Sequence, residues 1–284
     1  MAVVPSDLRR QDDLIARRLN GLRCEGRDGH DAAGTHPGRH GNRVRCALMG
    51  TILFDWDGTI VDSMEALFET TQATCRHLGL PFDREIFRRT FSPNWRLKYR
   101  ALGITEEHTD EAIAIWAKTF RADDTNPFPG VREALERLSA AGHRLGIVTS
   151  GDRSEIEPQL ARLGLEGLAA IRVYGNDTVA GKPDPRPLRL ALELAGAIRP
   201  EDALYVGDAL DDMRMAAAAG VRGIGIVSML ATADDLLAAG AVESAGSVLE
   251  WADRFLAVRR RKSHRPPGGV LLLGASNRED GRVP

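Results

Sequence analysis

Two aspartates stand two residues apart where an apolar run ends, in the stretch ILFDWDGTIVDS, residues 52–63. Asp55 and Asp57 are followed by Gly58 and Thr59, which suit a tight turn. One such carboxylate can act as a nucleophile, and a carboxylate beside it can donate and accept protons. A plain turn after a strand is the alternative interpretation of this motif taken alone.

A second acidic group, Asp208, Asp211 and Asp212, follows the apolar run ALYV. Acidic residues in that position can cap a helix, because they accept hydrogen bonds from free backbone amides. Bringing this group beside the first pair of aspartates would be strongly repulsive without a cation, and oxygen ligands suit Mg²⁺. The sequence therefore predicts a magnesium site. It assigns no role to the extra negative charge of Asp211.

Two more polar motifs also follow apolar runs. Thr149 comes after RLGIV, where its hydroxyl and the backbone amides of Ser150 and Gly151 can bind an anionic oxygen. Taken alone, a threonine at a strand end is more often structural. Lys182 stands in GKPDP, where a surface lysine is the default interpretation.

These motifs stand at the ends of expected strands. Five apolar segments predict strands: Thr51–Phe54, Arg144–Val148, Ile171–Tyr174, Ala203–Val206 and Gly223–Val227. They alternate with helical stretches, so the sequence predicts an α/β fold with a mainly parallel sheet. In such sheets ligands bind beyond the carboxyl ends of the strands, where DWDGT, TSG and GDALDD stand.

The chain divides into a core, an insertion and two ends. Residues 64–127 have apolar side chains at helical spacing, so we expect an all-helical cap domain inserted into a core of residues 49–63 and 128–258. Gly, Arg, His and Asp dominate much of the first part, and we expect residues 1–48 to be a disordered extension. Residues 259–284 are expected to be a disordered tail.

Composition excludes several classes of function. The formal net charge of −2 and the lack of a long central basic run argue against nucleic-acid binding and favour a small polar partner. No stretch reaches the ~18 apolar residues of a membrane helix. Cys24, Cys46 and Cys75 lack the spacing of a zinc site or a disulfide framework. We therefore expect a cytoplasmic protein, as a monomer or homodimer.

In this order the motifs DWDGT, LGIVTS, GKPDP and VGDALDD resemble those of the haloacid dehalogenase superfamily, specifically its phosphatase branch with a helical cap after the first motif. The resemblance covers roughly residues 50–255. It implies a Rossmann-like core and phosphoryl transfer through an aspartyl phosphate.

The resemblance also implies roles for single residues. Asp55 is the expected nucleophile, and Asp57 is the expected acid for the leaving oxygen and base for the attacking water. Lys182 would neutralise the nucleophile and the phosphate, and Thr149 would bind a phosphoryl oxygen. The implied catalytic set is Asp55, Asp57, Thr149 and Lys182.

The metal ligands also follow from the resemblance. Mg²⁺ would be held by the carboxylates of Asp55 and Asp208 and by the backbone carbonyl of Asp57, with Asp212 bound directly or through water.

Basic residues in the cap offer a route to specificity. Arg96, Lys98 and Arg100 follow one another in WRLKYR and could reach an anionic substrate tail, although a solvated helix face is the alternative. We assign Arg96 to the substrate site. The full expected substrate-binding set is Thr149, Ser150, Gly151, Lys182 and Arg96.

We therefore expect a magnesium-dependent phosphatase that acts on a small phosphorylated metabolite, either a phosphoglycolate-like ester or a sugar phosphate. A sugar phosphomutase shares the same core motifs and is the nearest alternative. A non-catalytic phospholigand-binding protein is the alternative from another class. Dehalogenation has no use for this magnesium-binding set.

Overall fold

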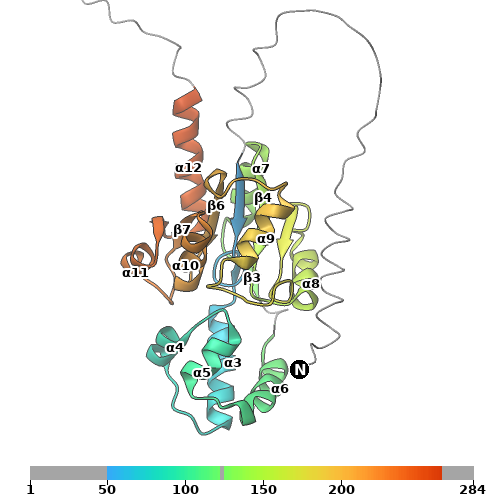
Figure 1. Ribbon diagram of the computed structural model, residues 1–284, viewed down its shortest axis with the longest axis vertical. Coiled ribbons are helices and arrows are strands. Elements are labelled where there is room, and N and C mark those ends of the chain that lie inside the picture. Colours follow the sequence, from blue (N-terminus) through green and yellow to red (C-terminus); the bar gives the residue numbers. More distant parts are fainter. Residues whose placement is uncertain (1–49, 122–124, 264–284) are drawn as a thin grey trace, which may run out of the picture.

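The structure, a computed structural model, describes residues 50–121 and 125–263. At its centre lies a six-stranded sheet in the order β5-β4-β1-β6-β7-β8 (Figure 1). Its strands are β1 (Thr51–Phe54), β4 (Arg144–Val148), β5 (Ile171–Val173), β6 (Ala203–Gly207), β7 (Arg222–Ile226) and β8 (Ala241–Ala245). All neighbouring pairs are parallel, which confirms the predicted α/β fold. The sequence analysis missed β8, an edge strand in which Val242 and Glu243 are exposed and the polar Ser244 is partly buried.

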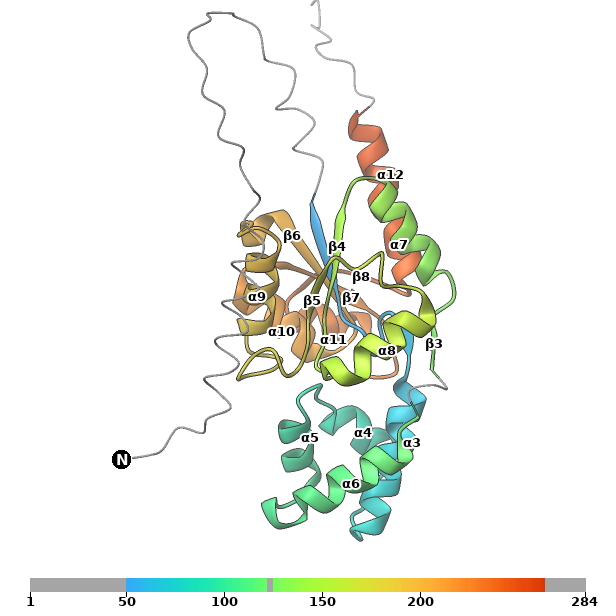
Figure 2. The ribbon, with the colours of Figure 1, turned by 90° about the vertical axis from the view of Figure 1, so that its right-hand side faces the viewer.

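Helices cover both faces of the sheet (Figure 2). One face carries α7 (Val131–Ala140), α8 (Arg153–Leu163) and α12 (Val248–Ser263), the other carries α9 (Arg186–Leu194) and α10 (Leu210–Ala219), and α11 (Ala233–Ala238) packs against β7 and β8. Ile52 and Phe54 of β1 belong to the core on the first face, and Leu53 belongs to the core on the second. Because successive strand side chains point to opposite faces, a sheet covered twice requires a continuous apolar run.

The C-terminal helix α12 is longer than the sequence analysis allows. It runs to Ser263, so the predicted tail boundary at residue 259 falls inside the helix and is wrong. Arginine and lysine are good helix formers, so a basic run need not end a helix. The rest of that expected tail and the expected extension of residues 1–48 lie outside the described residues. Among the helices that are described, none is long and apolar enough to cross a membrane.

Four helices form a separate lobe below the sheet (Figures 1 and 2). This helical lobe consists of α3 (Met64–His77), α4 (Arg84–Thr90), α5 (Trp95–Leu102) and α6 (Thr109–Thr119), with a short 3₁₀ turn at Glu106–His108. The helices fall within the insertion predicted for residues 64–127. The chain enters and leaves the lobe through β2 (Val61–Asp62) and β3 (Asn126–Pro127), which pair with each other in antiparallel fashion. This pairing ties the two chain crossings together.

The lobe rests against the loops that follow the strands of the sheet. Met64, Phe68 and Phe87 of the lobe form one buried apolar cluster with Ala209 and Leu230 of the core. Ala209 is the second residue after the end of β6, so this contact places the lobe over the carboxyl ends of the strands. Burying apolar surface between the two parts favours their close approach.

The register of the sheet brings the ends of its central strands level. Phe54 pairs with Ile147 of β4 on one side and with Val206 of β6 on the other. The chain builds β4 and β5 on one side of β1 and then returns to build β6, β7 and β8 on the other. The strand order therefore reverses beside β1, and in open parallel sheets ligands bind at such a point.

Gly146, in the middle of β4, tests how tightly the central sheet is packed. A Cβ atom at this position would lie 2.7 Å from both Ile171 Cβ and Leu53 Cδ2. We expect Gly146→Ala to lower the free energy of unfolding by about 1–3 kcal/mol, because the neighbours must move to admit the methyl group. Urea denaturation measures this change. Gly167→Ala is the matched control, since no atom lies within 4 Å of its added Cβ, and a similar loss in both variants would contradict the prediction.

Candidate active site

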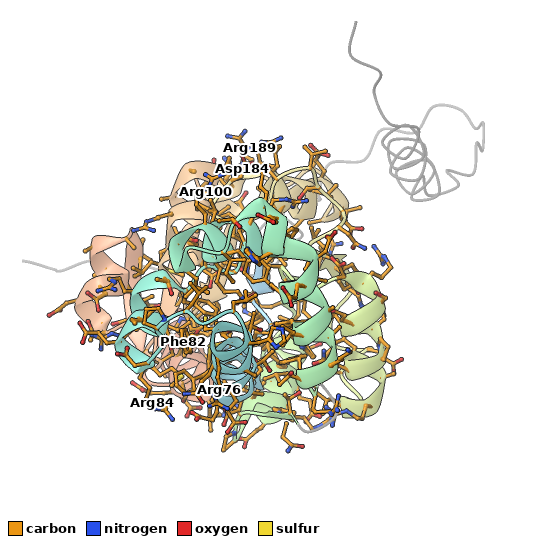
Figure 3. The ribbon with its side chains drawn as sticks, turned by 90° about the horizontal axis from the view of Figure 1, so that it is seen from below. Arg76, Phe82, Arg84, Arg100, Asp184 and Arg189 are labelled. Carbon is orange, nitrogen blue, oxygen red and sulfur yellow. The ribbon has the colours of Figure 1, made fainter. Side chains whose placement is uncertain are left out.

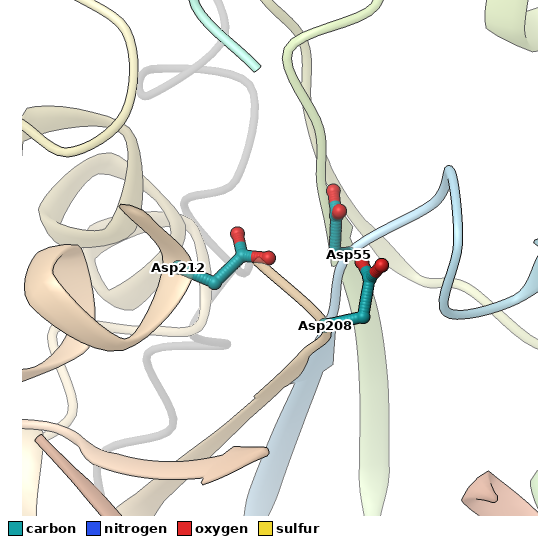
Figure 4. A group of neighbouring side chains, drawn as sticks. All are labelled: Asp55, Asp208 and Asp212. Atoms are coloured by element: carbon teal, nitrogen blue, oxygen red, sulfur yellow. The ribbon is translucent and has the colours of Figure 1, made fainter. Parts of the chain in front are cut away.

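Three buried carboxylates converge beyond the ends of β1 and β6 (Figure 4). Asp55 follows β1, Asp208 follows β6, and Asp212 lies in the first turn of α10. One oxygen from each lies within 4.8 Å of the others. The fold thus joins two motifs that are more than a hundred residues apart in the sequence.

Two glycines make room for these carboxylates. A Cβ atom on Gly58 would overlap the Asp208 carboxylate, and Gly58 also has a φ of +77°, which favours glycine. A Cβ atom on Gly207 would lie 2.5 Å from Asp212 Oδ2. The acidic cluster therefore depends on the absence of side chains at two neighbouring positions.

Lys182 is buried among these carboxylates and is not a surface lysine. Its Nζ lies 2.5 Å from Asp55 Oδ1 and 2.8 Å from Asp212 Oδ1, and its side chain is 1% exposed. Burial by itself would lower the pKa of Lys182, but the charges of Asp212 and Asp55 more than offset this and raise it. The amine therefore stays charged and holds Asp55 in place.

The cluster carries more negative charge than Lys182 can balance. Burial, with the charge of Asp212 adding to it, raises the pKa of Asp55 to about 7 although Lys182 opposes the shift. Burial likewise raises the pKa of Asp208 well above its usual range. Asp208 Oδ1 accepts a hydrogen bond from Thr59, whereas Oδ2 is buried without a partner in the described part of the chain. Converging carboxylate oxygens with one oxygen left over fit a divalent cation that prefers oxygen ligands.

Asp212 also caps its own helix. Its Oδ2 accepts a hydrogen bond of 3.1 Å from the backbone amide of Ala209, and the hydroxyl of Tyr205 lies 3.0 Å from its Oδ1. Capping is therefore confirmed for Asp212, and it is compatible with a place in the acidic cluster because the two oxygens contact different neighbours. The sequence analysis did not identify Tyr205, whose place in the apolar run ALYV gives no polar signal.

Asp57 stands apart from the three carboxylates and faces a cavity. Its Oδ1 accepts a hydrogen bond of 2.6 Å from the hydroxyl of Ser63, a residue that the sequence analysis did not single out. Burial raises the pKa of Asp57, although the Ser63 hydrogen bond partly opposes the shift. Ser63 stands six residues later, where the chain turns into α3, so only the folded loop reveals the contact.

The segment after β4 adds hydroxyl and amide groups to the same cavity. The Thr149 hydroxyl accepts a hydrogen bond of 3.1 Å from the amide of Gly151. Ser150 Oγ is buried and has no hydrogen-bond partner within the described ranges. A buried hydroxyl without a partner loses its hydrogen bonds to water, so a ligand that accepts its hydrogen would be favoured.

A cavity of about 400 Å³ separates the helical lobe from the ends of the strands. Its core wall contains Asp55, Asp57, Thr149, Ser150 and Gly151. The opposite wall is formed by α5, α6 and the segments beside them, and we call it the lobe wall. It contains Phe91, Trp95, Lys98, Tyr99, Trp116 and Phe120. The core wall is therefore polar, and the lobe wall is largely aromatic.

The three cations expected in the lobe point in different directions. Lys98 is buried and lines the cavity, whereas Arg96 and Arg100 are exposed and do not line it. Arg96 places its guanidinium 4.4 Å from the centre of the Trp95 ring, and Figure 3 shows Arg100 at the rim of the molecule. The spacing offers a signal, because Lys98 shares a helix face with Trp95 and with Leu102 four residues on.

Asp211 links the core to the helical lobe. Its Oδ2 accepts a hydrogen bond of 2.7 Å from the hydroxyl of Ser92, which lies between α4 and α5, and its Oδ1 accepts one of 3.0 Å from Arg214. The Ser92 hydroxyl also accepts a hydrogen bond from the amide of Asn94. The extra negative charge that had no role in the sequence analysis thus contacts the lobe.

Comparison with known proteins gives consistent matches. Residues 52–226 match the family model described as haloacid dehalogenase-like hydrolase. The chain is 33% identical over 194 residues to a phosphoglycolate phosphatase of Yersinia pestis, covering 64% of this chain and 83% of that protein. It is 30% identical over 201 residues to a phosphorylated carbohydrates phosphatase of Thermotoga maritima, covering 68% of this chain and 93% of that protein. The crystal structure of a hydrolase from Pseudomonas syringae shares the fold, with a TM-score of 0.67 and 24% identity. The match covers 74% of this chain and 99% of that one.

The hydrogen bond between Ser92 and Asp211 should restrain the segment between α4 and α5. We expect Ser92→Ala and Asp211→Ala each to speed amide hydrogen exchange in residues 91–103, because each removes the same contact between lobe and core. The double variant should exchange no faster than the faster single variant. Mass spectrometry of peptides measures the rates. Arg214→Ala is the control, and unchanged exchange in both single variants would show that the contact does not restrain the lobe.

Proposed function

The chain belongs to the haloacid dehalogenase-like hydrolase family, and on that premise we propose that it hydrolyses a small phosphomonoester with the help of Mg²⁺ and through an aspartyl phosphate on Asp55. It is a phosphatase that acts on phosphomonoesters, which agrees with its similarity to a phosphoglycolate phosphatase and to a phosphorylated carbohydrates phosphatase. The proposed substrate is a phosphoglycolate-like ester or a sugar phosphate. One observation carries the proposal: a single cavity joins Asp55 and Asp57 beside the acidic cluster, with Lys182 against Asp55.

The first half of the reaction is attack by Asp55. One oxygen of its carboxylate forms a bond to phosphorus while the bond from phosphorus to the ester oxygen breaks. The leaving oxygen takes a proton from Asp57, whose raised pKa favours the protonated form needed for this step. Lys182, 2.5 Å from Asp55 Oδ1, keeps the nucleophile oriented.

The second half returns Asp55 to its starting state. A water molecule attacks phosphorus and gives a proton to Asp57, while the bond from phosphorus to the Asp55 oxygen breaks and phosphate leaves. The hydrogen bond from Ser63 fixes the Asp57 carboxylate through both halves. Asp57 therefore ends each cycle protonated and ready for the next ester.

Neutral groups of the core wall would hold the oxygens that do not react. Ser150 Oγ is buried without a partner in the described chain, and Thr149 and Gly151 already order the segment around it. Donors fixed before the substrate arrives stabilise charge on the phosphoryl oxygens at little further cost in reorganisation.

The acidic cluster fits the proposed metal. The carboxylates of Asp55 and Asp208 and the backbone carbonyl of Asp57 would hold Mg²⁺, with Asp212 bound directly or through water. The unpartnered Asp208 Oδ2 and the raised pKa values of Asp55 and Asp208 support a missing positive charge at this place. When bound, the cation would offset the negative charge of the carboxylates and the phosphate.

Removing the proton shuttle tests the role of Asp57. We expect Asp57→Asn to lower kcat for 2-phosphoglycolate by roughly 10²–10⁴, because the amide neither donates nor accepts the proton. Where formation of the phosphoenzyme limits the rate, the loss should be smaller for p-nitrophenyl phosphate, because its leaving group needs no proton. Free phosphate measures both rates. Asp62→Asn is the control in the same segment, since Asp62 is exposed. Wild-type turnover of 2-phosphoglycolate by Asp57→Asn would refute the assignment.

Metal dependence is tested by removal and return of the ion. A chelator should abolish phosphate release and added Mg²⁺ should restore it, because the cluster is not neutralised by Lys182 alone. Asp208→Asn should raise the Mg²⁺ concentration needed for half-maximal activity. It should also reduce the increase in Tm that Mg²⁺ gives the unaltered protein. Asp234→Asn, at an exposed carboxylate, is the control, and full activity in chelator would rule out the metal.

A further inference from the structure

The side chain of Lys98 is buried in the lobe wall, and within the described residues its amine has no counter-ion. Its side chain is about nine-tenths buried and lines the cavity. No carboxylate lies within ion-pair distance of Nζ among the described residues, and Nζ lies instead over the face of the Tyr99 ring, 5.6 Å from the ring centre. Burial lowers the pKa of Lys98 to about 8, because Cys75 and Asp57 are too weak a counterbalance.

Charges around the cavity make Lys98 distinctive. It is the one lysine or arginine among the described residues that line the cavity. On the α8 side the lining includes Asp152 and Glu155, which repel an anion. An anionic group that extends from the phosphate site is therefore attracted toward α5 and away from α8.

The aromatic side chains of the lobe wall strengthen such an attraction. Trp95, Trp116 and Phe120 line the same cavity as Lys98 and present apolar surface to it. A charge pair in such surroundings is screened less than a pair on the protein surface. An amine in a partly desolvated wall gains from a negative partner, so a ligand that supplies a negative charge is favoured there.

We propose that Lys98 binds a second anionic group on the alcohol part of the substrate, so that the natural substrate is the phosphate ester of a hydroxy acid. The phosphate lies on the core wall and the carboxylate pairs with Lys98 in the lobe wall. This inference rests on the proposed phosphatase function and decides between its two substrate classes, because a sugar phosphate has a neutral alcohol part and leaves Lys98 unpaired. The cavity of about 400 Å³ also admits hydroxy acids larger than glycolate.

The test compares esters that differ in the second charge. One pair is 2-phosphoglycolate and 2-hydroxyethyl phosphate, and the other is 4-carboxyphenyl phosphate and phenyl phosphate. For each pair we compare kcat/KM for the anionic ester with kcat/KM for the neutral ester, as a ratio. The ratio is measured for the unaltered protein, for Lys98→Met and for Arg100→Met. Methionine is unbranched, nearly as long as lysine, and removes its charge. Arg100 is the matched control because it is exposed on the same helix and does not line the cavity.

The unaltered protein should prefer the anionic ester, and Lys98→Met should lower the ratio by about 10–100-fold, mainly through KM. Arg100→Met should keep the ratio within about threefold of the unaltered value. Equal losses on both esters of a pair would overturn the proposal, because Lys98 would then act on Asp57, on the phosphate or on lobe packing. If Lys98→Met does not fold, the ratio for the unaltered protein is the test. A ratio that shows no preference for the anionic esters overturns the proposal.

Failure of the underlying function would look different. If no phosphate is released from any of the four esters or from p-nitrophenyl phosphate in the presence of Mg²⁺, the phosphatase proposal itself fails. Release from the neutral esters at least as fast as from the anionic ones leaves the phosphatase intact and refutes only the role of Lys98.

Discussion

The burial of three carboxylates around one ammonium group is the constraint on which the rest of the structure depends. Like charges in a space from which water is excluded repel strongly, and Lys182 alone cannot neutralise Asp55, Asp208 and Asp212. Such an arrangement persists only where the surrounding backbone is rigid. The parallel sheet supplies that rigidity, because β1 is held by hydrogen bonds to a neighbour on each side.

The same constraint explains the division of the molecule into a core and a helical lobe. The core provides charged groups that must be fixed, so they stand at the ends of strands and at the first turn of a helix. The lobe provides mostly apolar side chains and one amine, and it contacts the core through an apolar cluster and the hydrogen bond from Ser92 to Asp211. A polar core wall that faces an aromatic lobe wall suits hydrolysis of a phosphoenzyme. In that reaction one positioned water molecule must attack while bulk solvent is kept away.

Much of the fold and of the core wall of the cavity was predictable from the sequence. Strand ends are marked by where apolar runs stop, so the sequence alone places Asp55, Thr149 and Asp208 at one edge of a parallel sheet. The short strand β8 was missed because the polar residues Glu243 and Ser244 interrupt its apolar pattern. The boundary at residue 259 was misplaced because a run of basic residues is compatible both with a helix and with a disordered tail.

The sequence by itself determined which chemical groups are present and the order in which they meet the ends of the strands. Tertiary structure alone decided which of Arg96, Lys98 and Arg100 faces the cavity, because the rotation of α5 is set by how it packs in the lobe. It likewise decided that Asp211 meets Ser92, 119 residues away. Local periodicity specifies a face of a helix, but only the packing of distant elements specifies what that face contacts.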